Sequence, residues 1–292
     1  MNTLKLISDY KHNEQHRLSF NQLAQEVFGI NFEPWYKQGG WNDRYICYSY
    51  IDADKVVANV SINKMDLVWE GQAMRALQIG TVMTHPDYRG KGLAASLMNT
   101  VLAEHESHYD FGYLFGDASA VGFYRKLGFS EIQESQFSLK VKPSTSVSGP
   151  LRRLDLDTST DRSLFEHLTG TRVPISQTLG AVNDQHLLLF YCLLAFPNNL
   201  YYLEDTDALV IYRVKESTLH LYDIIAAHAV SLELVLERIL TPEVTLVRFH
   251  FTPELENGEI LCEPMRTEDA LFVKPAIALV TKPFTFPYTS HA

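Results

Sequence analysis

The chain has 292 residues, of which 46% are hydrophobic and 21% charged, and its formal net charge is −10. This is a globular composition, and the length favours two domains over one. Because an acidic surface repels phosphate backbones and anionic lipids, we expect no nucleic acid or membrane partner. The negative charge either attracts cationic ligands, such as polyamines, amino sugars or lysine-containing peptides, or only keeps the protein in solution.

The first half of the chain mixes helical and extended patterns. Residues 12–29 have the apolar spacing of an amphipathic helix that ends near Gly29, and an aromatic loop is expected at 32–41. The strongest helical periodicity starts at Leu93. Further expected elements are strands at 45–51, 56–64, 74–84, 109–115 and 130–141 and a short helix at 118–127.

The second half repeats this mixture after a stretch rich in Ser, Pro and Gly at 143–150, which is predicted to be a linker. The expected elements are helices at 184–196 and 230–240 and strands at 199–204, 208–214, 218–225, 244–251 and 270–274. We therefore predict an α/β (α+β) protein with domains at 1–142 and 151–292.

Three cysteines, Cys47, Cys192 and Cys262, lie far apart without metal-ligand spacing. They fit a reducing cytoplasm as small buried hydrophobic residues, and we expect no metal. Residues 1–14 are polar, and no run of about 18 apolar residues predicts a membrane span. The expected location is cytoplasmic.

The segment with the clearest chemistry is the turn between the strand at 74–84 and the helix that starts at Leu93. Gly90 and Gly92 lack Cβ atoms, so a ligand can approach the backbone closely. The first amides of a helix have no intrahelical acceptor and lie at the positive end of its dipole. With Arg89 and Lys91 beside them, these amides predict a phosphate or pyrophosphate site. The residues do not fit the P-loop or the dinucleotide pattern.

Arg89-Gly90-Lys91-Gly92-Leu93-Ala94 resembles the acetyl-CoA signature Arg/Gln-x-x-Gly-x-Gly/Ala of the GNAT superfamily of N-acetyltransferases. Downstream, residues 117–129 resemble its second signature, Asn-x-x-Ala-x-x-Phe-Tyr-x-x-x-Gly-Phe, with Asp117 in the place of the usual Asn. The resemblance covers roughly residues 4–142. It implies a GNAT fold with a mixed, splayed central sheet, acetyl-CoA as co-substrate, and a small-molecule or peptide amine as acceptor.

The resemblance also implies roles for individual residues. Tyr124 would be the general acid that protonates the departing CoA thiolate. The backbone of Val82 or Met83 would polarise the thioester carbonyl. The residues that would bind the cofactor are Val82, Met83, Thr84, Arg89, Gly90, Lys91, Gly92, Leu93, Ala94 and Asp117.

The general base is left open, because the glutamate that some members carry on the central strand corresponds to Gln78, and an amide is not a base. A water chain with Asp117, His85 or an acidic residue of another loop is an alternative, although His85 is better explained as a cap or surface residue. A base supplied by the terminal carboxylate is another.

Substrate contacts are expected from Gln78 and from the aromatic run with Trp35 and Tyr36, which either stacks on a cation or only packs the loop. Residues 151–292 resemble a degenerate second GNAT-like domain, which would wall off the acceptor pocket or mediate homo-oligomerisation. Two alternatives to an acetyltransferase stay open: a non-catalytic acetyl-CoA sensor or subunit, and a transferase that uses another acyl-CoA.

Overall fold

The computed structural model describes residues 4–142, 151–255, 258–267, 269–275 and 282–291. These residues form two β-sheets with helices packed against them, so the predicted α/β fold class is confirmed. The expected linker at 143–150 lies outside the described residues. Among the helices that the structure describes, none has both the length and the apolar character needed to cross a bilayer.

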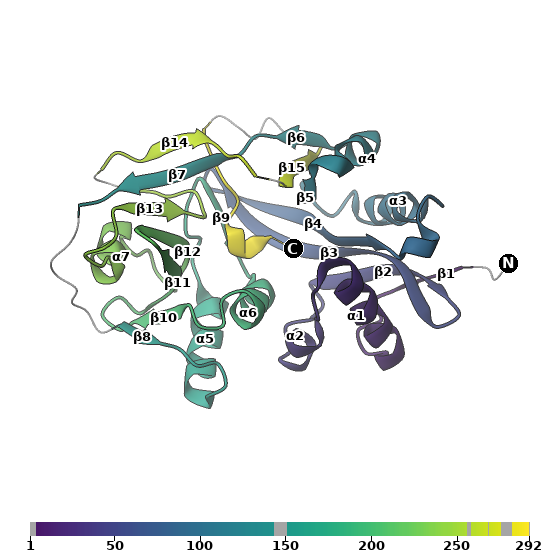
Figure 1. Cartoon of the computed structure of the whole chain (residues 1–292), viewed down its shortest axis with the longest axis horizontal. Helices are drawn as coiled ribbons and strands as arrows, with labels where there is room; N and C mark the ends of the chain where they lie inside the picture. The colour runs from purple at the N-terminus through teal and green to yellow at the C-terminus, as the bar shows by residue number, and fades with distance from the viewer. Residues whose placement is uncertain (1–3, 143–150, 256–257, 268, 276–281, 292) are drawn as a thin grey trace.

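The first sheet has eight strands among the described residues. In spatial order they are β1 (Lys5–Ser8), β2 (Tyr45–Asp52), β3 (Lys55–Trp69), β4 (Gln72–Thr84), β5 (Phe111–Asp117), β15 (Asp269–Lys274) and β6 (Ser130–Ile132), with β9 (Leu179–Val182) paired to β3. Figure 1 shows α1 (Glu14–Phe28) and α2 (Glu33–Lys37) on one side of this sheet and α3 (Leu93–His105) and α4 (Val121–Lys126) on the other.

The second sheet repeats part of this arrangement. Its spatial order is β14 (Leu261–Pro264), β7 (Ser135–Lys140), β13 (Leu246–Phe249), β12 (Thr218–Ala226), β11 (Ala208–Lys215), β10 (Leu200–Leu203) and β8 (Leu151–Arg153). The strands β12 and β13 are parallel and are connected through α7 (Leu232–Ile239), just as the parallel strands β4 and β5 are connected through α3. Two further helices, α5 (Ser159–Thr171) and α6 (Gln185–Leu194), lie between α7 and the first sheet (Figure 1).

The two sheets exchange strands. After β6 the chain leaves the first sheet, and β7 pairs with β13 and β14 of the second. In return, β15 from the C-terminal half inserts between β5 and β6, and β9 adds to β3. The division into domains at 1–142 and 151–292 stays a prediction, and these strands cross it. Because each half completes a sheet of the other, we expect the two halves to unfold together.

Local sequence explains where the first helices begin and end. Asn13 caps α1 by accepting a hydrogen bond from the His16 amide, and Gly29 ends the helix in the left-handed conformation, as predicted. The expectation of a loop at 32–41 was wrong in part, because residues 33–37 form α2. Pro34 stands in the first turn of that helix, where its missing N–H costs no hydrogen bond.

Two other expectations need correction. The strand expected at 130–141 is two strands, because the chain turns at Gln133 and Glu134 from one sheet to the other. Cys47 and Cys192 are buried as predicted, but Cys262 is exposed because it lies on β14, the edge strand of the second sheet.

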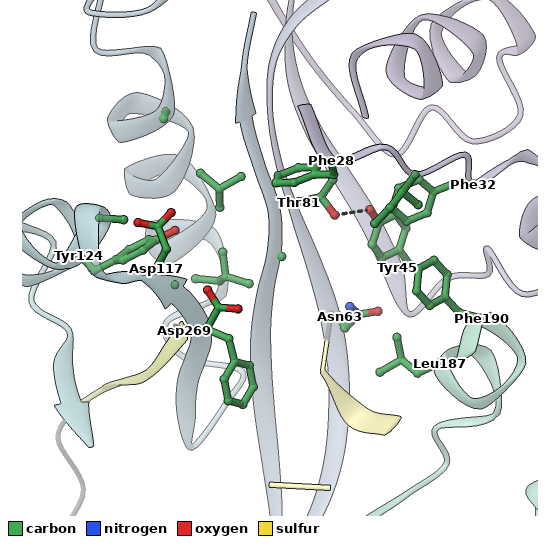
Figure 2. A pocket seen from close by; sticks show the side chains of 18 of the residues that line it. Phe28, Phe32, Tyr45, Asn63, Thr81, Asp117, Tyr124, Leu187, Phe190 and Asp269 are labelled. Carbon is green, nitrogen blue, oxygen red and sulfur yellow. Dashed lines mark hydrogen bonds between the residues drawn. The ribbon is translucent and has the colours of Figure 1, made fainter. Parts of the chain in front are cut away.

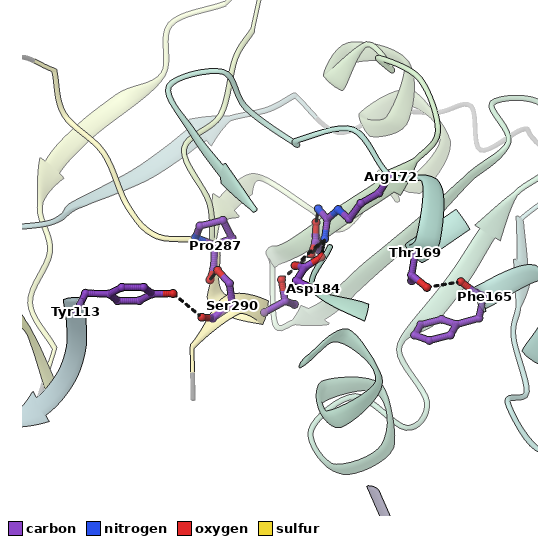
Figure 3. Close-up of polar contacts among 9 residues, drawn as sticks. Tyr113, Phe165, Thr169, Arg172, Asp184, Pro287 and Ser290 are labelled. Atoms are coloured by element: carbon purple, nitrogen blue, oxygen red, sulfur yellow. Dashed lines mark hydrogen bonds and ion pairs between the residues drawn. The ribbon is translucent and has the colours of Figure 1, made fainter. Parts of the chain in front are cut away.

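The C-terminal segment at 284–291 runs between the two sheets (Figure 1). Phe284 and Phe286 are buried, and the Phe286 ring stacks on Tyr113 of β5 with 4.6 Å between ring centroids. The Ser290 carbonyl accepts hydrogen bonds from the Tyr113 hydroxyl at 3.4 Å (Figure 3) and from Gln78 Nε2 at 2.8 Å. The segment therefore belongs to the core that both halves share.

A buried carboxyl group at the crossing point holds this segment. Glu134 Oε1 accepts hydrogen bonds from the Phe286 amide at 2.8 Å and from the Thr285 hydroxyl at 3.1 Å. Burial raises the pKa of Glu134 to about 7, although both hydrogen bonds act in the opposite direction. The Glu134 carboxyl group therefore binds its proton more tightly in the folded protein than in the unfolded chain. The stability that this protonated carboxyl group contributes is lost as the pH rises from 4.5 to about 7.

We expect Glu134→Gln, which is neutral at every pH, to gain stability relative to the wild type as the pH rises. The difference in free energy of unfolding should shift in favour of the variant by about 3 kcal/mol between about pH 4 and about pH 8. Urea denaturation across this range measures it, with the exposed Glu131→Gln as the control. A difference that does not change with pH would contradict the burial of an ionisable carboxyl group at this position.

Candidate active site

The sheet is open where β4 and β5 separate. These parallel strands pair only from Ala76 with Phe111 to Gln78 with Tyr113. Beyond that point, residues 79–84 of β4 do not pair with residues 114–117 of β5, and this leaves a slot between the two strands. The predicted splayed sheet is thus present, and it exposes backbone amides and carbonyls to a ligand that could lie along β4.

A cavity of about 710 Å³ extends from this slot to the aromatic residues on the other side of β4. Figure 2 shows Tyr124, Asp117 and Asp269 on one side of β4 and Tyr45, Phe32, Phe190, Leu187 and Asn63 on the other. The other residues that line it are Phe28, Ile30, Trp35, Ile79, Gly80, Thr81, Val82, Thr84, Ala94, Phe115, Gly116, Ala120, Phe123 and Tyr191.

The middle of β4 is distorted by a β-bulge. Thr81 and Val82 together lie opposite Val60 of β3, because Gly80 pairs with Ser61 and Met83 pairs with Asn59. Thr81 has a φ of 49°, which is rare for a β-branched residue. Its carbonyl accepts a hydrogen bond from Asn59 Nδ2 at 2.9 Å, and its hydroxyl lies 2.9 Å from the Tyr45 hydroxyl. These contacts hold the bulge in a conformation that the sequence alone would not favour.

The glycine turn before α3 has the geometry of an anion site. Gly90 and Gly92 have φ values of 74° and 76°, and a Cβ atom at either position would meet nothing within 4 Å. Gly92 is the N-cap of α3 and supplies no side-chain acceptor to the first amides of the helix. Arg89 Nε donates to the Thr84 carbonyl at 3.2 Å, and Lys91 Nζ lies 4.4 Å from the centre of the Tyr88 ring. Open backbone and two cationic side chains therefore adjoin the slot.

Tyr124 stands on α4 with its ring against β5. A Cβ atom on Gly116 would lie 2.6 Å from Tyr124 Cε2, so glycine is required there for the ring to pack on the strand. The side chain is 6% exposed, and its ring centroid lies 5.3 Å from that of Phe272 on β15. Burial, with a smaller effect of Asp117 and Asp269, raises the pKa of Tyr124 to about 12. The phenol therefore carries its proton at neutral pH.

Two carboxylates lie in the cavity beside Tyr124. Asp117 ends β5, and its pKa is lowered first by the Ser119 side chain and then by the Ser119 amide, which donates a hydrogen bond to it at 2.6 Å. Asp269 begins β15 and is the register partner of Asp117 across the two strands. No motif singled out Asp269, because only the insertion of β15 next to β5 brings it to the slot.

A family model for the acetyltransferase (GNAT) domain matches residues 11–132. Those residues are a GNAT domain. The protein is therefore an acyltransferase, and its GNAT domain takes the acyl group from an acyl-CoA such as acetyl-CoA. The sequence has no match among curated proteins.

Solved structures extend the likeness to both halves of the chain. A conserved protein from Enterococcus faecalis V583 has a TM-score of 0.61 and 15% identity over 93% of this chain and 72% of its own. A GCN5-related N-acetyltransferase from Kribbella flavida has a TM-score of 0.58 and 19% identity over 93% and 70%. Eis1 from Mycobacterium abscessus has a TM-score of 0.57 and 13% identity over 92% and 73%. At these identities the comparison establishes a shared fold.

The GNAT domain brings some of the predicted site residues to the cavity and leaves others apart. Of the predicted residues, those that line it are Trp35, Val82, Thr84, Ala94, Asp117 and Tyr124. Arg89, Gly90, Lys91, Gly92 and Leu93 lie in the adjoining turn and at the start of α3. Met83 is 2% exposed and belongs to the core beneath β4.

Two predicted substrate contacts do not line the cavity of the GNAT domain. The Tyr36 ring instead receives the Arg17 guanidinium, 3.8 Å from its centre. Gln78 is fully buried and bonds to Asn63 and to the Ser290 carbonyl. His85 is a cap, as the sequence suggested, because its Nδ1 accepts from the Asp87 amide at 3.3 Å.

The second half of the chain supplies one wall of the cavity. Leu187, Phe190 and Tyr191 of α6 line it beside the aromatic residues of the GNAT domain, and the Phe190 ring contacts Phe32 and Trp35. Trp35 Nε1 donates to the His186 carbonyl at 2.7 Å and fixes α6 against α2. The apolar character of the helix at 184–196 predicted its burial. The resemblance of residues 151–292 implied that the second half walls off the acceptor pocket or mediates homo-oligomerisation, but it did not indicate which helix would face the site.

Proposed function

We propose that the protein transfers an acetyl group from acetyl-CoA to a primary amine of a small molecule or peptide, by direct attack in a ternary complex. The observation that carries this proposal is the slot between β4 and β5, with the glycine turn at one end and the Tyr124 phenol beside it. Acyl-CoA supplies the activated thioester. The amine nitrogen forms a bond to the acetyl carbon and the carbon–sulfur bond breaks. The nitrogen loses one proton to water and the CoA sulfur gains one, so the products are the N-acetyl amide and free CoA.

Each part of the slot has a task in this proposal. The amides that follow Gly90 and Gly92 would bind the pyrophosphate, with Arg89 and Lys91 adding positive charge. A backbone amide at the bulge around Val82 would stabilise negative charge on the carbonyl oxygen. Tyr124 would donate its phenolic proton to the leaving sulfur, for which its protonated state suits it.

The cofactor part of the proposal is tested by Gly90→Ala and its control Gly71→Ala. Both glycines have a φ of +74°, and at both a Cβ atom meets nothing within 4 Å, so the two variants should lose similar stability, about 1 kcal/mol. Because Gly71 lies in the turn between β3 and β4, only Gly90→Ala should also weaken binding of acetyl-CoA, by about tenfold. Isothermal titration calorimetry measures both affinities.

The outcomes of this measurement are distinct. If the wild type binds neither acetyl-CoA nor CoA, the proposal is wrong. Binding without release of free thiol in the presence of any amine would instead favour a non-catalytic sensor or subunit. Faster thiol release from a longer acyl-CoA than from acetyl-CoA would identify a transferase of another acyl group.

A further inference from the structure

The charged side chains that line the cavity all lie on one side of β4, together with apolar residues such as Phe115 and Phe123. The carboxylates of Asp117 and Asp269 lie next to Tyr124 on one side of β4 (Figure 2). On the other side, the residues form what we call the aromatic chamber: Phe28, Ile30, Phe32, Trp35, Tyr45, Leu187, Phe190 and Tyr191. Among the described residues that line this chamber, none carries a carboxylate or a cationic group.

The polar atoms of the chamber are already engaged inside the protein. Tyr45 bonds to Thr81, and the Tyr191 hydroxyl donates to the His291 carbonyl at 3.1 Å. The indole nitrogen of Trp35 donates to the His186 carbonyl. Asn63, at the edge of the chamber, bonds to Gln78 and to His186 Nε2. The chamber therefore offers an acceptor mainly ring faces and edges, and few free hydrogen-bonding groups.

The rings hold one another in place. The Phe190 centroid lies 5.5 Å from that of Phe32 and 5.7 Å from that of Trp35, the latter pair edge to face. Phe32 also stacks on Tyr45 at 6.0 Å. Because these contacts join α6 to the segment after α1, the walls are ordered before a ligand arrives. Rigid aromatic walls favour a flat apolar group, which can make offset or edge-to-face contacts with them.

The chamber also limits the charge of the acceptor. An amine must be neutral when it attacks, and apolar surroundings favour the neutral form. A polyamine or an amino sugar would bring further ammonium or hydroxyl groups into a space without partners for them, at a cost for each buried group. An acceptor with one amino group and an apolar remainder avoids that cost. Although the chain has a net charge of −10, the described residues that form the aromatic chamber carry no carboxylate that would attract a cationic acceptor.

We propose that the acceptor is a monoamine with an aromatic ring on a short alkyl arm, an arylalkylamine, with its ring in the aromatic chamber. This inference rests on the proposed acetyl transfer and names its substrate class. The short arm follows from the position of Tyr45, which lines the chamber and bonds to Thr81 of the bulge. The Phe32 and Phe190 rings contact each other at 5.5 Å, so the substrate ring would pack against their cavity-facing sides, with its amino group toward β4 and the slot.

The substrate class is tested by thiol release at a fixed concentration of acetyl-CoA with 2-phenylethylamine, spermidine and glucosamine. We expect kcat/KM for 2-phenylethylamine to exceed both other values at least tenfold. A higher value for spermidine or glucosamine would overturn the inference while leaving acetyl transfer intact. Acetyl-CoA binding without turnover of any of the three would overturn the proposed transfer to such amines, and the inference with it.

A pair of variants on α6 locates the ring. Phe190→Ala should raise KM for 2-phenylethylamine about tenfold and leave KM for acetyl-CoA unchanged. Leu194→Ala is the matched control, because Leu194 lies on the same helix, is 39% exposed and does not line the cavity. An unchanged KM for the amine in Phe190→Ala would place the acceptor elsewhere.

A third variant tests the charge argument directly. Phe190→Glu adds a carboxylate to the aromatic chamber, so it should shift the ratio of kcat/KM toward spermidine over 2-phenylethylamine at least tenfold. A ratio that stays at the wild-type value would show that the charge of the chamber does not select the acceptor. The heat of acetyl-CoA binding, measured for each variant, confirms that the folded cofactor slot is retained.

Discussion

Replacing Tyr124 with phenylalanine is expected to lower kcat by about 10²–10⁴-fold, the usual contribution of a general acid. The phenol lies beside the slot, and its pKa of about 12 keeps it protonated, so it can give a proton to a departing thiolate. Because Phe keeps the ring that packs on Gly116 and Phe272, the fold and the binding of acetyl-CoA should change little. Steady-state kinetics with calorimetry separates the two effects.

The matched control for this prediction is Tyr201→Phe. Tyr201 lies on β10 of the second sheet, and its hydroxyl makes only a 3.5 Å contact with the Asn198 carbonyl among the described residues. Its kcat should therefore equal that of the wild type. If Tyr124→Phe also keeps nearly normal kcat, Tyr124 has a packing role, and the leaving sulfur takes its proton from water.

The parts of the site that could be predicted from the sequence are those that a continuous segment builds. The turn at 89–92 and the helix after it follow from glycine, basic residues and apolar spacing within about a dozen neighbours. The place of Tyr124 was implied by the resemblance of residues 117–129 to the second GNAT signature, which also lies in one continuous segment. Local interactions decide these conformations, so a single sequence is enough to anticipate them.

The parts that escaped prediction depend on contacts between distant segments. Asp269 enters the cavity because β15 pairs with β5, which lies more than a hundred residues earlier in the chain. Phe190 faces the site because the Trp35 indole fixes α6 against α2. A contact between distant segments also explains why Gln78 does not line the cavity. It was expected to contact a substrate, but its Nε2 donates a hydrogen bond to the Ser290 carbonyl. Periodicity shows which residues are buried, but not which distant segment covers them.

The second large expected effect concerns a buried ion cluster that ties the two sheets to the C-terminal segment. Arg172 Nη2 lies 2.9 Å from Asp223 Oδ1, and Nη1 lies 3.2 Å from Asp184 Oδ2 (Figure 3). All three side chains are at most 1% exposed. The Thr289 hydroxyl donates to Asp223 Oδ2 at 2.5 Å. Although burial opposes the charge, both carboxylates raise the pKa of Arg172, so the guanidinium stays ionised.

Arg172→Met is expected to lower the free energy of unfolding by about 3–5 kcal/mol, because it leaves two buried carboxylates without a counter-charge. Urea denaturation followed by circular dichroism measures the loss. Arg125→Met is the control, since its ion pair with Glu131 has 62% and 44% exposed side chains and should contribute less than about 1 kcal/mol.

A second variant separates charge from packing. Adding Asp184→Asn and Asp223→Asn to Arg172→Met removes the unpaired charges, so the triple variant should recover part of the lost stability. If the single variant loses no more than the Arg125 control, the cluster is not what holds α6 and the C-terminal segment in place. If the triple variant is less stable than the single one, the loss comes from packing or hydrogen bonds. Partial recovery would instead show that the unpaired buried carboxylates cause most of the loss.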